Sequence, residues 1–256
     1  MNIEGVKTDG FVPMADMLNH KRPKQTTWTY TDEKQGFVIE AIGDIPRNEE
    51  IFDSYGKKCN SRFFLNYGFI VRNNDANEVP LCVSYNPGDK YIVNKKDMIK
   101  DPSEFKKFRV TDNLRETNMH EFFSWVRFVE FDENYTVLID YEARAATKSG
   151  YGDDSDDERF DQNKGFKAKE LPALSVRNET KVMLRMKLEC QKVLNGYPTS
   201  LEDDLKQIEE DAEGSGPVPV SENYRNALLM RSGEKKVLKY LMETVDKILP
   251  LFSMNL

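Results

Sequence analysis

Two stretches near the start of the chain decide the fold: FVPMADMLNH at residues 11–20 and IFDSYG at residues 51–56. A third, NYGF, follows at residues 66–69. The asparagine amide of the first stretch can both donate and accept hydrogen bonds, and the histidine beside it adds another donor and acceptor. Gly56 allows a sharp backbone bend that leaves the phenol of Tyr55 at the end of a strand. Each stretch alone is typical of a turn or a core aromatic, but their order and spacing make them candidates for chemistry.

Composition and charge narrow the class of protein. The 256 residues are 39% hydrophobic and 32% charged, which is enough apolar material for a sizeable core with a well-solvated surface. The formal net charge is −7, and the pI is about 5.2. An acidic chain is poorly suited to a broad nucleic-acid-binding face, whereas a basic protein or peptide partner fits it well.

The number and spacing of the cysteines and histidines argue against a metal site and against a set of disulfide bonds. Cys59, Cys82 and Cys190 are odd in number and far apart, and His20 and His120 are the only histidines. No pair has the spacing of zinc ligands. The sequence also lacks an apolar signal core and any run of the ~20 apolar residues that cross a bilayer. We expect a reduced protein without a metal, soluble and located in the cytoplasm or nucleus.

The first third of the chain favours short strands. Residues 26–31 are β-branched and aromatic, and residues 37–42 and 51–52 favour two further strands around polar turns. Residues 60–67 suit one or two helical turns, which Gly68 would end as a C-cap.

The remainder favours helices. Residues 119–129 and 182–190 carry apolar side chains at helical spacing, and residues 224–248 suggest one or two further helices. Thr199 and Glu202 predict a capping box at the start of another helix.

Two polar segments interrupt these elements. Residues 151–162 are rich in aspartate and predict an acidic solvated loop. Residues 209–220 combine acidic residues with glycine and proline, which is typical of a connection between helices.

Together the motifs resemble a known family. The Asn-His pair, the strand with Glu49, Glu50, Asp53 and Tyr55, and the later Tyr-Gly-Phe are similar to the C-terminal half of a SET domain. The resemblance is closest to the class that includes the Rubisco large-subunit methyltransferase. It extends to the helical substrate-binding domain of that class through GYPTSLEDD at residues 196–204 and SGEK at residues 232–235.

The resemblance implies an α+β protein with two domains. Residues 1–95 would be part of a SET β-fold, and residues 96–256 an all-α substrate-binding domain that includes the acidic loop. It implies S-adenosylmethionine as methyl donor and a protein substrate held partly by the helical domain. The acidic charge and the lack of a long apolar run separately lead us to expect no direct binding of nucleic acid or membrane.

The resemblance also assigns roles to individual residues. Asp16, Met17, Leu18, Asn19 and His20 match a segment that lines the cofactor, and Tyr67, Gly68 and Phe69 match a second one. Tyr55 matches the catalytic tyrosine beside the transferred methyl group. Tyr30 matches an aromatic of the acceptor channel, in which Tyr67 also takes part. Trp28 points to the same face of its strand as Tyr30, so the sequence leaves both as channel residues.

The acceptor and the extent of the chain are further expectations. Lysine is the expected acceptor, histidine is the alternative enzymatic acceptor, and a non-catalytic interaction module is the alternative of another class. Relatives carry a Gly-rich turn and several strands before the Asn-His motif, for which residues 1–10 are too short. We therefore expect a fragment of a longer protein or an incomplete gene model, and no measurable cofactor binding by the 256-residue chain.

Overall fold

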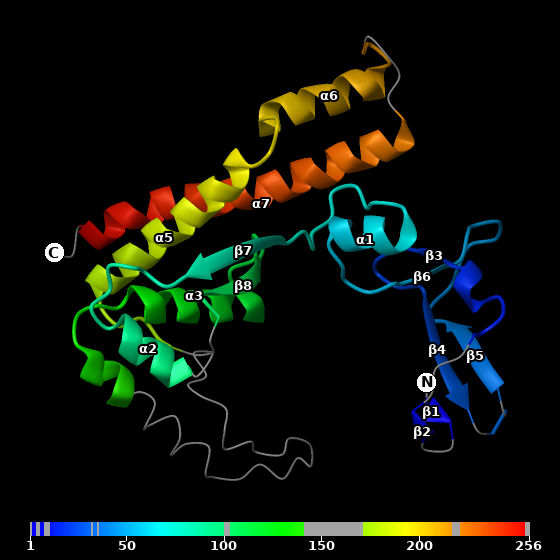
Figure 1. Ribbon diagram of the computed structural model, residues 1–256. Helices are drawn as coiled ribbons and strands as arrows, with labels where there is room; N and C mark the ends of the chain where they lie inside the picture. Colours follow the sequence, from blue (N-terminus) through cyan, green and yellow to red (C-terminus); the bar gives the residue numbers. More distant parts are fainter. Residues whose placement is uncertain are drawn as a thin grey trace. The chain divides into compact units, whose positions relative to one another are not determined.

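The computed structural model divides into two compact units, Met1–Lys58 and Cys59–Leu256. The residues that it describes are 2–3, 6–7, 11–31, 33–34, 36–99, 103–140, 171–216 and 221–253. The acidic loop predicted at residues 151–162 lies outside this set. Figure 1 labels the helices and strands of both units.

Short strands make up the first unit. They are β1 (Asn2–Ile3), β2 (Val6–Lys7), β3 (Asn19–His20), β4 (Thr26–Thr31), β5 (Gly36–Ala41) and β6 (Phe52–Asp53), with a 3-10 turn η1 at Ala15–Met17. β1 pairs with β2 and β4 with β5 in antiparallel fashion, whereas β3 and β6 are parallel (Figure 1). The strands predicted at 26–31, 37–42 and 51–52 are confirmed to within a residue at each end.

Little of the first unit is buried. Thr26 is the only buried side chain among those described there, at 2% exposure. Phe11, Met14, Met17 and Trp28 all expose more than half of their surface. Burial of apolar surface is the main favourable term in folding. In this unit it is small, so it offsets little of the entropy that is lost when the backbone becomes ordered.

The second unit combines a hairpin with helices. The chain as a whole confirms the predicted α+β class, but the strand Phe105–Val110 corrects the prediction that residues 96–256 are all-α, because it pairs with Val79–Ser84. The elements of the second unit are α1 (Asn60–Tyr67), β7 (Val79–Ser84), α2 (Ile92–Ile99), β8 (Phe105–Val110), α3 (Thr117–Glu130), α5 (Val176–Asn195), α6 (Leu201–Glu213) and α7 (Glu222–Ser253). Residues 224–248, for which one or two helices were predicted, lie within the single helix α7.

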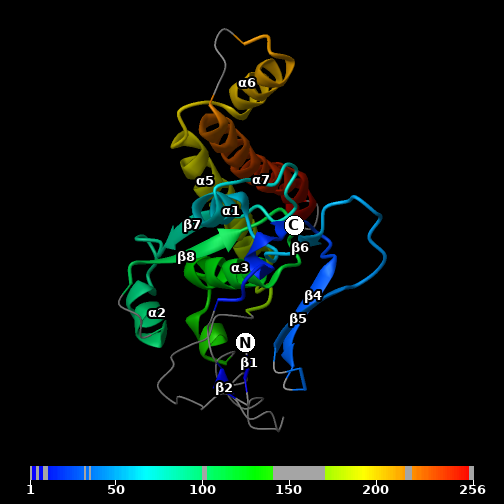
Figure 2. The ribbon, with the colours of Figure 1, turned by 90° about the vertical axis from the view of Figure 1, so that its right-hand side faces the viewer.

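The core of the second unit surrounds the β7–β8 hairpin. Val79, Leu81 and Val83 alternate inward along β7 and are almost fully buried. Figure 2 shows α3 on one side of the hairpin and α5 and α7 on the other. Trp125 of α3 is buried and donates from its indole N–H to the Val83 carbonyl at 3.3 Å. The alternation of the strand and the apolar stripes of the helices therefore meet in one core.

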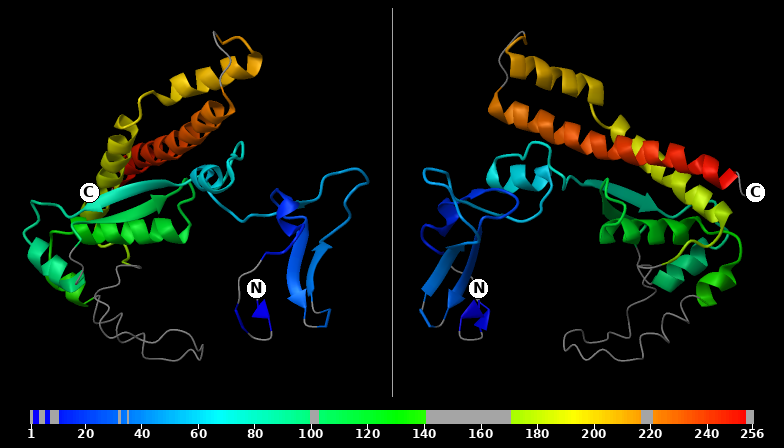
Figure 3. Two further views of the ribbon diagram at one scale, coloured as in Figure 1. Left: turned by 45° about the vertical axis from the view of Figure 1, so that its right-hand side comes forward. Right: turned by 180° about the vertical axis from the view of Figure 1, so that it is seen from behind.

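A buried ionic cluster joins α6 to α7, which lie side by side in Figure 3. Asp204 of α6 is fully buried and accepts from both Arg231 and Lys235 of α7. The Lys235 ammonium, also buried, donates to the carbonyls of Thr199 and Ser200 as well. These bonds compensate for the burial of two charges and fix the start of α6 against α7.

The start of α6 corrects the predicted cap. The capping box consists of Ser200 and Asp203, each side chain accepting from the other's backbone N–H at 3.0 Å. Thr199 instead donates from its hydroxyl to Asp204 at 2.7 Å. The prediction was wrong by one residue because Thr199 is engaged in the buried cluster. The helix continues to Glu213, so residues 209–213 of the predicted connection are helical.

The division between units does not coincide with the predicted domain boundary near residue 95. α1 contacts α7, and β7 pairs with β8, so the chain from Cys59 onward packs with the helices. The predicted boundary near residue 95 stays a prediction, because compact units defined by contacts need not coincide with sequence domains.

Candidate functional site

The parallel β3–β6 pair brings two of the predicted motifs together in the first unit. Asn19 is opposite Phe52, and His20 is opposite Asp53. The backbone N–H of Lys21 extends the pairing by donating to the Asp53 carbonyl at 2.9 Å. Residues separated by more than thirty positions in sequence thus share one ladder, which places the Asn-His pair beside the strand that leads to Tyr55.

Tyr55 is held by this pair at both its backbone and its phenol. Its backbone N–H donates to Nδ1 of His20 at 3.0 Å, and its phenol donates to the Leu18 carbonyl at 2.7 Å. The Lys58 ammonium donates to the Tyr55 carbonyl. Gly56 follows at φ 91°, a backbone conformation that glycine adopts readily. The predicted sharp turn after the tyrosine is therefore present.

The electrostatics of His20 agree with its role as an acceptor. Burial lowers the pKa of His20, and the positive charges of Arg22 and Lys58 lower it further. A neutral imidazole has one acceptor nitrogen, which here is the Nδ1 that receives the Tyr55 N–H. Protonation would remove this acceptor, so the geometry around Tyr55 depends on His20 staying neutral.

Asp53 positions the aromatic side of the site. Its carboxylate accepts from the Thr26 hydroxyl at 3.0 Å and from the Trp28 indole N–H at 3.1 Å. Trp28 also packs against Phe37 of β5, with ring centroids 5.3 Å apart. The Asp53 carboxylate, at the end of β6, thus orients the Trp28 side chain, which is more than half exposed.

An open hollow of about 410 Å³ lies among these side chains. Its lining combines aromatic and aliphatic groups with two carboxylates: Phe11, Val12, Ala15, Asp16, Leu18, Trp28, Phe37, Ile39, Asp53 and Tyr55. Aromatic faces and a carboxylate suit an aliphatic chain that ends in an amine. Tyr30 is not among the lining residues, so the structure brings Trp28 rather than Tyr30 to Tyr55.

The lining also includes Phe37 and Asp53, which were not among the predicted site residues. Asp53 could have been singled out from its alternation with Tyr55, since residues two apart on a strand share a face. No sequence signal pointed to Phe37, because its contact with Trp28 depends on the register of β4 against β5, in which Phe37 is directly opposite Tyr30.

The other predicted segment, Tyr67 to Phe69, belongs to the second unit. Gly68 ends α1 in the left-handed conformation at φ 76°, which confirms the predicted cap. The ring of Phe69 stacks on the buried Phe63 with centroids 5.3 Å apart. Tyr67 is 46% exposed, and its ring lies 6.0 Å from that of Phe69. The Tyr67 and Phe69 rings thus form an aromatic surface that packs on the buried Phe63.

The state of the cysteines, the grouping of possible metal ligands and the length of the apolar helices are further features of the described ranges. The three cysteines are free; Cys59 and Cys190 are buried, and burial raises the pKa of Cys190 to about 12. No group of His, Cys, Asp and Glu side chains in those ranges is arranged to hold a metal ion. No helix described there is long and apolar enough to cross a bilayer.

Comparison with known proteins identifies the family. The model of the Rubisco LSMT substrate-binding family matches residues 86–238, which is more than half of the chain. The chain belongs to this family. Its fold is similar to that of Rubisco LSMT bound to AdoMet, with a TM-score of 0.65 and 21% identity over 95% of this chain and 51% of that one. The resemblance predicted from the motifs is thereby confirmed.

Two curated relatives match nearly the whole chain. An actin-histidine N-methyltransferase of Xenopus tropicalis is 24% identical over 252 residues, or 97% of this chain and 39% of the relative. A [fructose-bisphosphate aldolase]-lysine N-methyltransferase of Arabidopsis thaliana is 23% identical over 242 residues, or 90% of this chain and 44% of the relative. The chain spans less than half the length of each of these two relatives.

Proposed function

We propose that the protein containing this chain transfers a methyl group from S-adenosylmethionine to a lysine side chain of another protein. The observation that carries the proposal is the fixed position of Tyr55 against Leu18 and His20 at the edge of an aromatic hollow. Membership of the Rubisco LSMT substrate-binding family and similarity to a lysine N-methyltransferase support it. We further propose a cytoplasmic or nuclear location and a basic protein as partner.

The residues of the chain fit the methyl donor by their chemistry. The Asn19 carboxamide is exposed, and its nitrogen donates to Glu50 at 2.5 Å. An amide NH₂ has two N–H groups, so Asn19 can still offer a donor and an acceptor to the edge of an adenine. Within the second unit, the ring surface of Tyr67 and Phe69 is of a kind that packs on the face of an aromatic base. Asp16, Met17, Leu18 and His20 complete the proposed cofactor-lining set. When bound, the donor supplies an electrophilic methyl group on a sulfonium.

The chain's own contribution to the reaction is alignment. An in-line displacement is accelerated chiefly by holding the two reacting groups at the correct distance and angle. The Tyr55 phenol donates to the Leu18 carbonyl, and a phenol oxygen can also accept weak C–H contacts from a methyl group. The aromatic faces of Trp28 and Phe37 would pack along the aliphatic part of the lysine chain, and Asp53 would hold its amino end. The amine then attacks carbon, the carbon–sulfur bond breaks, and the surplus proton leaves to water.

Histidine is the second candidate acceptor. The observation in its favour is the match to an actin-histidine N-methyltransferase over 97% of this chain. Both acceptors present a neutral nitrogen to the methyl group, so the proposed alignment by Tyr55 serves either. The hollow beside Trp28 favours lysine in our proposal because an unbranched aliphatic chain fits between aromatic faces more readily than a ring does.

Methyl transfer from tritiated S-adenosylmethionine to lysate proteins provides the test. We would assay the 256-residue chain and a chain extended at its N-terminus by upstream in-frame sequence. Hydrolysis of the labelled protein then separates methyllysine from methylhistidine. Methyllysine is the expected product, and methylhistidine would favour the second acceptor. Absence of both labels with both chains, together with absence of cofactor binding in calorimetry, would refute the enzyme and leave a non-catalytic interaction module.

Tyr55 is tested by substitution in whichever chain is active. We expect Tyr55→Phe to lower kcat by about tenfold or more, which corresponds to about 1.4 kcal/mol of transition-state stabilisation. The affinity for S-adenosylmethionine should change by less than about twofold, because the phenol acts on the methyl and the amine. Tyr240→Phe, at an exposed position of α7, is the matched control. An unchanged kcat in Tyr55→Phe would remove this residue from the mechanism.

A further inference from the structure

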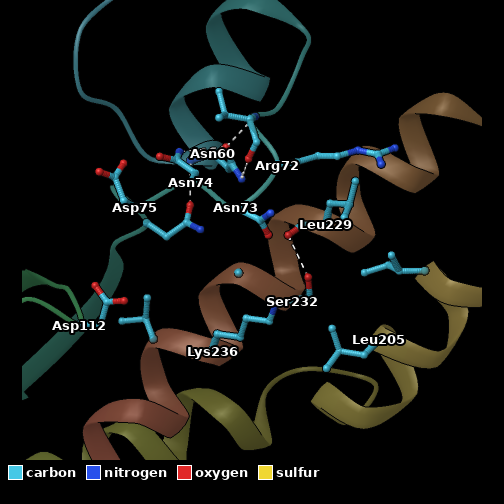
Figure 4. Close-up of a pocket in the computed structure, with 15 residues that line it drawn as sticks. Asn60, Arg72, Asn73, Asn74, Asp75, Asp112, Leu205, Leu229, Ser232 and Lys236 are labelled. Carbon is cyan, nitrogen blue, oxygen red and sulfur yellow. Dashed lines mark hydrogen bonds between the residues drawn. The ribbon is translucent and has the colours of Figure 1, made fainter. Parts of the chain in front are cut away.

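A second hollow, of about 520 Å³, lies wholly within the second unit (Figure 4). One wall is Asn60 of α1 with the loop from Val71 to Asn77. The other wall consists of Leu205 and Ile208 of α6 together with residues 229–237 of α7. The loop begins two residues after Phe69, so this wall continues directly from the segment proposed to line the cofactor.

The two ends of this hollow differ in chemistry. Figure 4 shows Asp75 and Asp112 at one end and Leu205 and Leu229 at the other. Both aspartates are exposed. Leu205 is 39% exposed although it lies on the inner side of α6. A carboxylate end and an aliphatic end therefore face one continuous open space.

Lys236 lies between the two ends (Figure 4) and is exposed. An ammonium there can donate to a main-chain carbonyl of a bound segment. Arg72, the other cation of the lining, extends away from the aspartates in the same view. Asp112 is exposed at the carboxylate end of the hollow, so a cation of a bound segment can reach its carboxylate.

The walls are fixed before any partner arrives. Asn60 accepts from the Val71 N–H and donates to the Val71 carbonyl, both at 3.0 Å, and this ties the loop to α1. Asn77 accepts from the Asn60 N–H at 3.2 Å, and its amide lies close against Gly233 of α7. A preformed hollow loses little conformational entropy on binding, which favours its use as a docking site.

We propose that this hollow docks an extended segment of the protein substrate that carries an aliphatic residue and, two positions away, a lysine or arginine. Residues two apart on an extended chain point to the same side, so one segment can fill the Leu205 end and reach Asp112. The helical lining lies within residues 86–238, which match a substrate-binding family. The identity of the partner as a substrate rests on the proposed function.

Fluorescence polarisation with three labelled nonapeptides tests the docking without requiring catalysis. Each peptide has a Gly-Ser host and a central Leu-Ser-Lys, Leu-Ser-Glu or Ser-Ser-Lys. We expect the 256-residue chain to bind Leu-Ser-Lys about tenfold more tightly than Ser-Ser-Lys because one aliphatic side chain is buried. The preference over Leu-Ser-Glu should be about threefold, as is typical of an exposed charge pair.

Two variants test the carboxylate end and the aliphatic end of the hollow separately. Asp112→Lys should reverse the preference between Leu-Ser-Lys and Leu-Ser-Glu, and Leu205→Ser should abolish the preference for leucine. Leu188→Ser, at an exposed leucine of α5 outside the lining, is the control and should leave both preferences intact. Circular dichroism confirms that each variant is folded.

Equal affinity of the wild-type chain for all three peptides would overturn the docking proposal, as would a folded Asp112→Lys variant with unchanged preferences. Either result leaves the tritium-transfer assay free to succeed. Conversely, selective peptide binding without methyl transfer by any chain would support docking and refute the proposed enzyme.

Discussion

Gly233 in the middle of α7 provides the sharpest test of how the second unit is assembled. A Cβ added at this position would lie 2.6 Å from Nδ2 and 3.3 Å from Cγ of Asn77. The Asn77 amide cannot simply swing away, because its oxygen accepts from the Asn60 N–H at the start of α1 at 3.2 Å. Gly233→Ala therefore forces either a shift of the loop or loss of that hydrogen bond.

Two effects of opposite sign set the size of the change. Replacing glycine by alanine inside a helix stabilises by about 1 kcal/mol. Overpacking a fitted contact costs roughly 1–3 kcal/mol. Taking about 2 kcal/mol for the contact, Gly233→Ala should lower the free energy of unfolding by about 1 kcal/mol. In an Asn77→Ala background the contact is gone, so the same substitution should raise stability by about 1 kcal/mol. The coupling between the two sites is then about 2 kcal/mol.

Urea unfolding followed by far-UV circular dichroism measures all four chains of this double-mutant cycle. Asn73→Ala, in the same loop, replaces Asn77→Ala in a control cycle, and its coupling to Gly233→Ala should be close to zero. The reasoning is refuted if Gly233→Ala changes the free energy of unfolding by the same amount with and without the Asn77 side chain.

Three further predictions concern the junction of α6 and α7. Lys235→Met should destabilise by about 3 kcal/mol in urea unfolding, because it leaves part of the charge of the buried Asp204 uncompensated; a loss below about 1 kcal/mol would contradict this. Glu234 accepts a hydrogen bond from Tyr197 at 2.7 Å, and burial raises the pKa of its carboxyl. The contribution of Glu234 to stability is therefore fully present below the ordinary pKa of a glutamate and is lost as the pH rises through the raised pKa. Glu234→Gln should therefore raise the thermal midpoint at pH 7 but not at pH 4, and an equal effect at both would be inconsistent. Ser200→Ala should cost about 1 kcal/mol by the same unfolding assay through loss of the helix cap, and no change would contradict that role.

Local chemistry made several elements predictable. The run of β-branched and aromatic residues at 26–31 forms β4 with the same bounds, and Gly68 caps α1 in the left-handed conformation as expected. In both cases the preference resides in the residues themselves: χ1 stiffness in the strand and freedom at positive φ in the glycine.

Other features could not be predicted because they depend on distant partners. The N-cap of α6 is Ser200 and not the predicted Thr199, because the threonine hydroxyl donates to Asp204. Asp204 in turn accepts from Lys235 of α7. Trp28, rather than Tyr30, lines the hollow with Tyr55, since the indole N–H reaches Asp53 on β6. Alternation along the strand gave both aromatics the same face and could not choose between them.

The sequence by itself determined the family, the mixed α+β class and the residues proposed to carry the chemistry, since motif order and side-chain type are properties of the chain. Tertiary structure alone decided how those residues meet. It placed the Asn19-His20 pair beside the strand of Tyr55 through a parallel ladder, and it held Asn77 against Gly233 to shape the second hollow. The physical reason is that such contacts join residues far apart in sequence, and their geometry follows from strand register and helix packing.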